Sequence, residues 1–373
     1  MKTLRIGMLG FGNIAKVHAL AIEAMPYILD NVSYVPSIKK IYKPGKLKNR
    51  WLQSKHVSNI EAIVEDKKID IVDICSPNSA HRQQACTAIQ KGKAVYLEKP
   101  LGLNLNEAKQ ITDALGCWGP VLNQVAFMYR FMPAMVALRD LVQDGQLGEI
   151  FNFRFDALHS SYLSEERALG WKLNAKESGG GPLLDLGVHL ADSIRFCLGE
   201  IKTVSTTLGT VVKERPLADG SRGTVDVEDW AYVNMRLRNG ARGILNVSRV
   251  AALAEERTTF EVYGSLGSAL FEIRQPRSLR VFRHKIGKEE LVANPVYSDW
   301  GEYLSTIYPP KKLSLGWLAD AHFASMANTF NSFTAGEILR KEAPDFHEAR
   351  MSQAVIEAAY TSAVRSAPVE VSN

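Results

Sequence analysis

The sequence predicts an α/β protein of two domains: a doubly wound parallel-sheet domain at 1–130 and, at 131–373, an α+β domain with a large open, mostly antiparallel sheet. Three observations support this fold class. The chain has 373 residues, which is more than a single hydrophobic core usually serves. Up to about residue 130, short apolar runs alternate with helix-period segments, as in a parallel sheet covered on both faces. Beyond that point, long runs of alternating polarity indicate an antiparallel sheet.

The N-terminal domain begins with a strand, a tight glycine turn and a helix within 4–25. A weaker strand is predicted at 31–38, because Pro36 cannot donate a hydrogen bond to a sheet. The elements expected after it are a short helix and a strand within 60–77, a helix at 79–93, a strand at 94–100, a helix at 104–117 and a strand at 119–128. Their nearly continuous apolar runs indicate strands that are buried on both faces.

The C-terminal domain is expected to contain two helices, at about 132–145 and 185–198, around an extended stretch at 149–162. Between 201 and 285, alternating runs are separated by "RNGARG" and "GSLGSA", which are typical of hairpin turns. We therefore predict one wide sheet with helices on one face and an open opposite face. The chain then returns to helix, and these last helices can pack back on the N-terminal domain.

Charge and cysteine content exclude several classes of protein. Lys and Arg total 45 and Asp and Glu total 40, and no basic stripe interleaved with aromatic residues indicates nucleic-acid binding. The four cysteines stand at no metal-ligand spacing, so we expect reduced thiols in a cytoplasmic protein and no metal site. No run of 18 uncharged apolar residues predicts a membrane span, and the N-terminus does not resemble a signal peptide.

The segment "GFGNIA" at 10–15 has the spacing of a dinucleotide-binding turn. Gly10 permits a sharp turn, Gly12 lets a pyrophosphate approach the main chain, and the small Ala15 lets helix and strand pack closely. Its place between a strand and a helix favours a nicotinamide dinucleotide, NADP or NAD, over a tight turn without a ligand. The turn residues assigned to the cofactor are Gly10, Phe11, Gly12, Asn13 and Ile14.

The end of the second strand slightly favours NADP. A protein that prefers NAD places an acid there, about 20 residues beyond the first glycine, to bind the ribose 2′-hydroxyl. Asp30 has this count but precedes the strand, whereas Ser37, Lys39 and Lys40 stand near its predicted end. A hydroxyl and two cations suit a 2′-phosphate. The alternative is that both lysines are solvated.

Five further motifs follow one another in the order typical of one enzyme family. They are "ICSPNSAH" at 74–81, "EKP" at 98–100, "GGGPLLDLGVHLAD" at 179–192, "VEDWA" at 227–231 and "YGSLGSALFE" at 263–272. Over nearly its whole length the chain resembles the Gfo/Idh/MocA family of sugar and cyclitol oxidoreductases, such as glucose-fructose oxidoreductase and inositol dehydrogenase. The resemblance implies an N-terminal Rossmann domain and homodimers or homotetramers that form through the C-terminal sheet.

The resemblance also implies a catalytic set, which here is Lys99, Asp185 and His189. Oxidation of a secondary alcohol needs a base whose pKa lies near the working pH, which suits His189. Negative charge gathers on the alcohol oxygen in the transition state, and Lys99 can stabilise it. If a helix begins at Asp185, positions four apart share a face, so Asp185 can bind a substrate hydroxyl or orient the imidazole.

Other polar residues lie in the loops around these motifs, although loop residues of this kind are often only solvated. The cofactor-binding set is completed by Ser76, Pro77, Asn78, His81, Glu98, Lys99, Arg130, Trp171 and Lys172. The predicted substrate contacts are Lys99, His159, Asp185, His189 and His322.

The leading prediction is an NAD(P)-dependent dehydrogenase or reductase of a sugar, a sugar derivative or a cyclitol. Two alternatives stay open. One is an NAD-dependent glycosidase of the same family, which oxidises its sugar transiently while the cofactor stays bound. The other is a non-catalytic NADP-sensing regulator, against which the intact Lys99, Asp185 and His189 argue.

Overall fold

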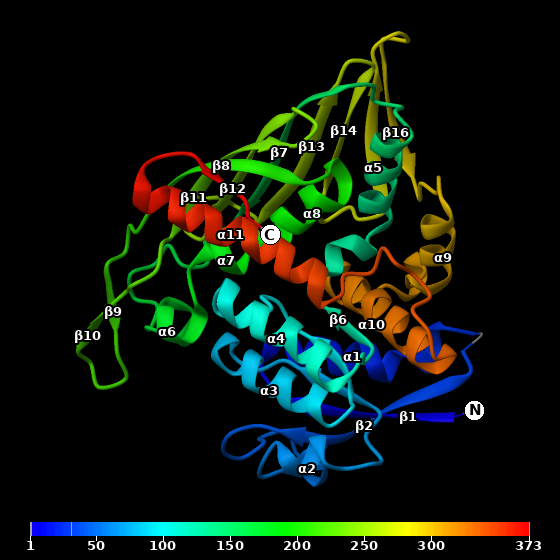
Figure 1. Ribbon diagram of the computed structural model, residues 1–373, viewed down its shortest axis with the longest axis vertical. Coiled ribbons are helices and arrows are strands. Elements are labelled where there is room, and N and C mark those ends of the chain that lie inside the picture. Colours follow the sequence, from blue (N-terminus) through cyan, green and yellow to red (C-terminus); the bar gives the residue numbers. More distant parts are fainter. Residues whose placement is uncertain (1, 31, 373) are drawn as a thin grey trace. The chain divides into compact units, whose positions relative to one another are not determined.

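The computed structural model describes residues 2–30 and 32–372, which form two compact units (Figure 1). The first unit comprises the segment that ends at Gly102, together with Asn106–Phe131 and Tyr303–Arg350. The second comprises Leu103–Leu105, Met132–Glu302 and the segment that begins at Met351. The break at Phe131 lies next to the boundary expected from the sequence, but a late segment of the chain returns to the first unit.

The first unit is built on a six-stranded parallel sheet in the order β3-β2-β1-β4-β5-β6. Its strands are β1 (Lys2–Leu9), β2 (Tyr34–Tyr42), β3 (His56–Val57), β4 (Ile71–Ile74), β5 (Ala94–Leu97) and β6 (Asn123–Val125). Every residue of β4 and β5 is buried, as their continuous apolar runs predicted. The strand order reverses between β1 and β4, and ligands of doubly wound sheets bind at the carboxyl ends beside such a reversal.

Helices cover this sheet, and one of them comes from the C-terminal part of the chain. The helices are α1 (Asn13–Ile28), α2 (Glu61–Val64), α3 (Asn78–Gln90), α4 (Leu105–Trp118) and α10 (Trp317–Ala335). α3 packs against β4 and β5, whereas α10 packs against α1 and β5. The expected doubly wound fold is confirmed, and α10 supplies one of its covering layers.

The second strand differs from the prediction. Asn31, where the predicted strand 31–38 began, lies outside the described residues, and β2 continues to Tyr42. Pro36 is tolerated because β3 pairs with β2 only at Ile41 and Tyr42, so Pro36 lies on an outer edge of the sheet. The carboxyl end of β2 therefore lies beyond Lys40. This position matters because the end of the second strand is where this fold binds the cofactor ribose.

The second unit contains a nine-stranded sheet in the order β16-β15-β14-β13-β7-β12-β11-β8-β17. Its strands are β7 (Ile150–Leu158), β8 (Ile201–Gly209), β11 (Trp230–Leu237), β12 (Arg242–Ser248), β13 (Arg257–Gly264), β14 (Gly267–Glu272), β15 (Ser278–Arg283), β16 (Lys288–Ala293) and β17 (Val369–Glu370). Only β7 and β12 pair in parallel among these described strands, and both predicted hairpins are present as β11–β12 and β13–β14. A small separate sheet joins β9 (Glu214–Pro216) to β10 (Arg222–Thr224).

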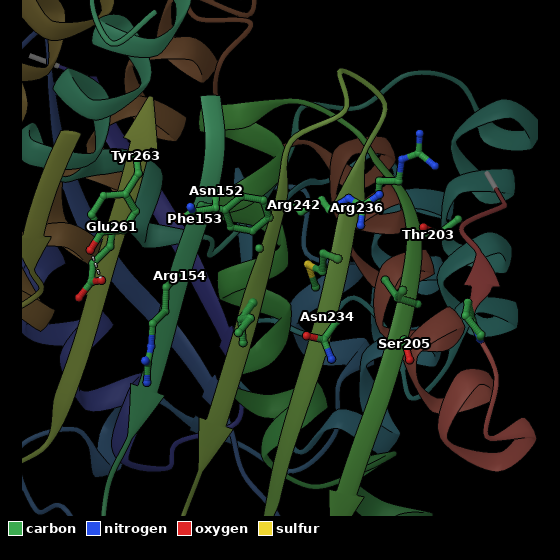
Figure 2. A pocket seen from close by; sticks show the side chains of 15 residues that line it. Asn152, Phe153, Arg154, Thr203, Ser205, Asn234, Arg236, Arg242, Glu261 and Tyr263 are labelled. Atoms are coloured by element: carbon green, nitrogen blue, oxygen red, sulfur yellow. Dashed lines mark hydrogen bonds between the residues drawn. The ribbon is translucent and has the colours of Figure 1, made fainter. Parts of the chain in front are cut away.

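The two faces of the nine-stranded sheet differ. Helices α5 (Pro133–Gln143) and α8 (Gly187–Leu198) pack on one face, where β11 places buried residues such as Val233. The opposite face carries polar side chains such as Arg154, Asn234 and Arg236, and it is hollowed into a depression (Figure 2). The remaining helices are α6 (Ala175–Ser178), α7 (Pro182–Asp185), α9 (Asp299–Ile307) and α11 (Phe346–Arg365). Across the described ranges, every helix is too short or too polar to span a membrane.

Candidate active site

The glycine turn lies where the carboxyl end of β1 meets α1. Gly10 has a φ of +94°, and a Cβ there would lie 2.6 Å from the Cys75 carbonyl oxygen, so only glycine fits. A Cβ on Gly12, by contrast, would have no atom within 4 Å among the described residues. Gly12 is also the N-cap of α1 and brings no side chain to that helix end. An open cradle at a helix N-terminus fits the pyrophosphate of a dinucleotide.

Other turn and loop residues have mostly internal contacts. Phe11 and Ala15 are buried, whereas Asn13 is exposed beside them. After β4, the Ser76 hydroxyl donates to Gln84, and Pro77 is exposed. The ring nitrogens of His81 lie 2.7 Å from the Pro100 carbonyl and 3.0 Å from the Ser76 carbonyl. His81 therefore ties this loop to the segment after β5, and Asn78 begins α3 as a buried residue.

Glu98 and Lys99 follow β5 directly, at the sheet edge where ligands bind in this fold. Glu98 is buried, whereas Lys99 is only partly buried. The main-chain N–H of Lys99 donates to Glu98 Oε2 over 3.2 Å. The position of Lys99 at a carboxyl strand end is thus the one that the motif predicted, and Glu98 supports its main chain.

A buried cluster, which we call the His18 cluster, lies behind Glu98 and was not predicted. Its members are His18, Asp73, Cys75, Glu98 and His322. His18 Nδ1 lies 3.0 Å from Asp73 Oδ1, and His18 Nε2 lies 3.2 Å from both Glu98 Oε1 and His322 Nδ1. No spacing along the chain indicated this cluster, because its members come from α1, from β4 and the residue after it, from the end of β5 and from α10.

The cluster separates the pKa values of its two histidines. Burial would lower the pKa of His18, but Cys75 and Asp73 outweigh it and raise this pKa well above its usual value. Burial and the neighbouring His18 charge lower the pKa of His322 to about 3. Burial would raise the pKa of Glu98, yet the hydrogen bond from His18 and the nearby positive charges lower it to about 2. At neutral pH the cluster therefore holds charged His18 and Glu98 beside a neutral His322.

One sequence prediction needs correction here. His322 was expected to contact substrate, but its side chain is 1% exposed and belongs to the His18 cluster. The expectation of no metal site stays a prediction, and donor atoms of His18, Glu98 and His322 lie within 4.8 Å of one another. Sequence spacing could not reveal this, since the three residues meet only through the packing of α10 on α1.

The predicted contacts for a 2′-phosphate are also misplaced. Ser37 pairs with Arg5 in the middle of β2, and Lys39 is an exposed residue of the same strand. Lys40 Nζ lies 2.7 Å from the Asp66 carboxylate and donates to the Ala62 carbonyl. Because β2 continues to Tyr42, the residues that follow its carboxyl end are those of the segment 43–50.

Arg130 stands in the first unit as a framework residue. Its guanidinium is 3% exposed and donates to the Glu342 carbonyl and to the Glu348 carboxylate. These contacts join the 3₁₀ turn Met128–Phe131 to the start of α11. These described contacts are those of a framework residue, and the cofactor role of Arg130 stays a prediction.

In the second unit, Asp185 is held by two cations. Lys172 Nζ lies 3.1 and 2.9 Å from its two carboxylate oxygens, and an Arg249 nitrogen lies 3.2 Å from Oδ2. Arg249 is buried and also donates to the Lys172 carbonyl, whereas the neighbouring Trp171 is 39% exposed. Lys172 therefore positions Asp185 within this unit, and its contact with the cofactor stays a prediction.

The glycine run that precedes Asp185 has a steric reason. A Cβ on Gly180 would meet the Tyr360 hydroxyl, and one on Gly181 would meet the Glu228 main chain. Glu228 also accepts hydrogen bonds from the Gly181 and Leu183 N–H groups at 3.0 and 2.9 Å, which caps α7. The "VEDWA" segment thus fixes the short helix that ends in Asp185.

Asp185 and His189 do not share one helix as expected. Asp185 ends α7 and His189 lies in the first turn of α8, with Leu186 between the two helices. Leu186 still has right-handed helical dihedral angles, so the chain turns nearly as a continuous helix would. His189 is 4% exposed in this unit.

His159 belongs to the surroundings of Asp185. It follows β7, and its Nδ1 lies 2.8 Å from the Ser161 hydroxyl. Burial first, and then the charge of Arg249, lower the pKa of His159 to about 4. A neutral imidazole is therefore present near Asp185 at physiological pH, which is compatible with the predicted substrate contact.

Comparison with known proteins places this chain in a family. The model of the oxidoreductase family with an NAD-binding Rossmann fold matches residues 4–119, and the GFO/IDH/MocA C-terminal domain matches residues 135–270. The chain belongs to the GFO/IDH/MocA family. This membership makes it an oxidoreductase with an NAD-binding domain and confirms the resemblance that the motifs indicated.

Several members of the GFO/IDH/MocA family are similar over long stretches. Levoglucosan dehydrogenase of Pseudarthrobacter phenanthrenivorans is 28% identical, covering 96% of this chain and 97% of its own. A solved structure of levoglucosan dehydrogenase with NADH and levoglucosan has a TM-score of 0.90 at 28% identity and covers all of both chains. The 1,5-anhydro-D-fructose reductase of Ensifer adhaerens is 30% identical over 65% of this chain and 69% of its own.

Sequence reasoning missed three residues of this GFO/IDH/MocA protein. His18 stands on the buried side of α1, and its only signal was a polar residue in an apolar helix face. Arg249 follows the end of β12. Its carboxylate partner could not be deduced from the sequence. Glu228 was inside a quoted motif, but its capping role depends on contacts with a segment 45 to 47 positions earlier.

Proposed function

We propose that this protein is a dehydrogenase or reductase that transfers a hydride between a nicotinamide and a CH–OH carbon of a sugar, a sugar derivative or a cyclitol. The observation that carries the proposal is the similarity to levoglucosan dehydrogenase over the whole chain. The motif residues Lys99, Asp185 and His189 are all present. Levoglucosan is a sugar derivative, so anhydrosugars are the first substrates to test.

Each of the three motif residues has a role that its surroundings support. Lys99 stabilises negative charge on the reacting oxygen, because an ammonium in a partly buried position acts strongly on such a charge. His189 exchanges the hydroxyl proton as general base or acid. Asp185 binds a substrate hydroxyl, and its two cations hold the carboxylate in place as an acceptor.

The cofactor is held by the glycine turn in this proposal. Main-chain N–H groups at the start of α1 bind the pyrophosphate, with Gly12 giving it access. When bound, the nicotinamide supplies the redox chemistry by accepting or donating a hydride. Ser76, Pro77 and Asn78 line the path beyond the turn as the loop that follows β4.

We retain a preference for NADP over NAD, with different residues as its basis. No acid occurs between residues 31 and 60, and the segment 43–50 after β2 carries Lys43, Lys46, Lys48 and Arg50. Cations at this strand end suit a 2′-phosphate. Lys43→Ala with Lys46→Ala should lower NADP affinity severalfold, whereas Lys39→Ala should not. Calorimetry that finds tighter NAD binding by the unaltered protein would refute the preference.

We also propose that the protein forms a homodimer or homotetramer through the open face of the nine-stranded sheet. Large side chains such as Tyr232, Ile244 and Tyr263 are 49%, 37% and 40% exposed along its strands. Exposed apolar surface of this kind is usually covered by a partner. Light scattering at micromolar concentration should give a multiple of the chain mass, and a monomeric mass would refute this assembly.

The reaction is tested with a panel of anhydrosugars, aldoses, sugar acids and inositols, read by absorbance of the reduced nicotinamide with either cofactor. Stoichiometric reduction of NADP or NAD with one substrate class supports the proposal. Release of an aglycone from a glycoside with only catalytic amounts of cofactor would instead indicate the glycosidase. Tight cofactor binding without any turnover would favour the regulator. A cytoplasmic location stays a prediction from the free thiols of Cys75, Cys86 and Cys117.

A further inference from the structure

The Glu228 carboxylate is buried in the second unit and accepts three hydrogen bonds. Its Oε2 accepts the Gly181 N–H over 3.0 Å, and its Oε1 accepts the Leu183 N–H over 2.9 Å. The Tyr360 hydroxyl donates to the same Oε1 over 3.0 Å. Burial raises the pKa of Glu228, while the two N–H groups and the Tyr360 hydroxyl act against this rise. The three donors therefore favour the charged form, which can accept all of them.

Tyr360 lies on α11, and its hydroxyl packs directly against the glycine run. A Cβ on Gly180 would overlap the Tyr360 hydroxyl, and a Cβ on Gly181 would overlap the Glu228 carbonyl oxygen. Glycine at these two positions leaves room for both partners. The phenol and the carboxylate are thus fitted to the main chain just before α7, and a shift of either side chain is transmitted to it.

The main chain that Glu228 holds continues directly to Asp185. The Asp185 N–H donates to the Gly181 carbonyl over 3.0 Å, one helical turn after the N–H that Glu228 accepts. The helix α7 has four residues, and a helix this short has little stability of its own. The direction in which Asp185 points therefore depends on contacts from outside the helix, among them those of Glu228.

The next residue along the chain, Asp229, reaches Asp185 by a second route. The Asp229 carbonyl accepts the Arg249 N–H over 2.9 Å, and an Arg249 side-chain nitrogen lies 3.2 Å from Asp185 Oδ2. Asp229 is itself anchored, because its Oδ2 accepts two N–H groups of the segment 211–212, at 2.7 and 2.9 Å. The same short segment therefore contacts both the main chain before Asp185 and one of the two cations that hold its carboxylate.

We propose that Glu228 and Tyr360 are positioning residues for the reaction: the Tyr360 hydroxyl orients the Glu228 carboxylate, and this carboxylate holds the start of α7 so that Asp185 faces a substrate hydroxyl. The inference rests on the proposed role of Asp185 in binding substrate. It goes beyond the capping of α7, because it makes the kinetics depend on a phenol from the last helix of the chain.

The first test is Tyr360→Phe, which removes one hydroxyl and keeps the ring beside Gly180. Glu228 then loses one of its three donors. Because a small misplacement of a binding group is costly, the substrate KM should rise about threefold to tenfold, with a smaller change in kcat. The Kd for the cofactor should stay the same, since the glycine turn belongs to the first unit. An unchanged KM in a folded Tyr360→Phe variant overturns the proposal.

The second test is Glu228→Gln, which addresses the carboxylate itself. The amide keeps one acceptor oxygen but places an NH₂ group where the other oxygen accepted a main-chain N–H. One of the two contacts at the start of α7 is then replaced by two facing donors. The substrate KM should rise about tenfold, which is more than in Tyr360→Phe. A KM equal to that of the unaltered protein overturns the proposal, and if Glu228→Gln does not fold, Tyr360→Phe decides alone.

A matched control deletes a different buried hydroxyl from the same helix. The Ser362 hydroxyl accepts the Thr206 N–H over 3.1 Å and donates to the Ala367 carbonyl over 2.7 Å, so it ties α11 to β8. Ser362→Ala should lower the melting temperature without changing the substrate KM. A rise in KM equal to that of Tyr360→Phe would show that a general loosening of α11 suffices, and it would overturn the proposal.

Asp185→Asn separates this inference from the proposed function. A near-normal KM and kcat in Asp185→Asn refute the proposed role of Asp185, and the inference falls with it. A raised KM in Asp185→Asn beside an unchanged KM in Tyr360→Phe refutes only the positioning role. If both roles hold, Tyr360→Phe added to Asp185→Asn should raise KM no further, since residues that act as a unit are not additive. An equal rise in both backgrounds overturns the proposal.

Discussion

The first unit pairs its buried carboxylate Glu98 with the imidazole of His18, whereas the second pairs Asp185 with Lys172 and Arg249. The histidines follow the same division. Burial would lower the pKa of His18, but Cys75 and Asp73 raise it above its usual value, while burial and Arg249 lower the pKa of His159 to about 4. An isolated imidazole can lose its proton in the accessible pH range, whereas isolated ammonium and guanidinium groups titrate far above it. The comparison teaches that, of these two described pairings, the one in the first unit uses a histidine as its cation.

The largest expected effect concerns Lys99. Lys99→Ala should lower kcat by about 10²–10³, the loss typical of one preorganised charge-stabilising group. Cofactor affinity should hold, because the Gly10–Ala15 turn is unchanged. Steady-state kinetics and calorimetry measure both quantities. A near-normal kcat would mean that the first unit contributes cofactor binding only, and the comparison of two catalytic halves would fail.

His189→Ala tests the second unit in the same way. Kcat should fall by a comparable factor of about 10²–10³ at neutral pH, because the general base is removed. Part of the rate should return at high pH, where hydroxide replaces the base. A pH–rate profile of the variant checks this. A loss that stays constant with pH would assign His189 to packing, since it is almost fully buried.

Lys172→Met sharpens the contrast between fixed and titratable cations. Asp185 keeps Arg249 but loses contacts at 3.1 and 2.9 Å, so its orientation toward a substrate hydroxyl weakens. The substrate KM should rise about tenfold, in line with one hydrogen bond to a charged group. Lys213→Met, at an exposed position of the same unit, is the control and should leave KM unchanged. Equal KM values for both variants would contradict the positioning of Asp185 by Lys172.

The pH dependence of stability separates the two kinds of pairing. The pKa of His322 is about 3 in the folded protein, below the unfolded value near 6.5. Its contribution to the free energy of unfolding is therefore complete above about pH 6.5 and is lost as pH falls toward 3. The pKa of Glu98 is about 2 in the folded protein, below its usual value of 4.5. Its contribution to the free energy of unfolding is therefore lost as pH falls from 4.5 toward 2. His18 has the opposite sign, because its raised pKa stabilises the fold at low pH and is lost as pH rises through the folded value.

Urea unfolding at about pH 7 and about pH 5 measures the contribution of His322. His322→Asn should flatten the acid loss of stability, by at most about tenfold in the unfolding equilibrium per pH unit. An unchanged slope in His322→Asn would assign the acid sensitivity to His159 and thus to the second unit. The second unit, and not the first, would then cause the acid loss of stability. The carboxylate pairings in the two units would remain as described.

Local sequence determined much of this protein. The glycine turn, the strand–helix alternation and the hairpins depend on neighbouring residues, because turn geometry and apolar periodicity are short-range properties. Lys99 at a strand end and the glycines before Asp185 could be recognised for the same reason. The family could also be recognised, since its motifs stand in order along the chain.

Only the tertiary structure decided which charges meet. β2 continues past Pro36 because that residue lies on an outer edge of the sheet, which no local pattern reveals. The segment 43–50, and not Lys40, therefore follows the carboxyl end of β2. His322 is separated from His18 by 304 positions, yet the packing of α10 on α1 brings their nitrogens within 3.2 Å. Arg249 reaches Asp185 across 64 positions. Side-chain electrostatics depends on distance in space and on burial, and neither is encoded in sequence separation.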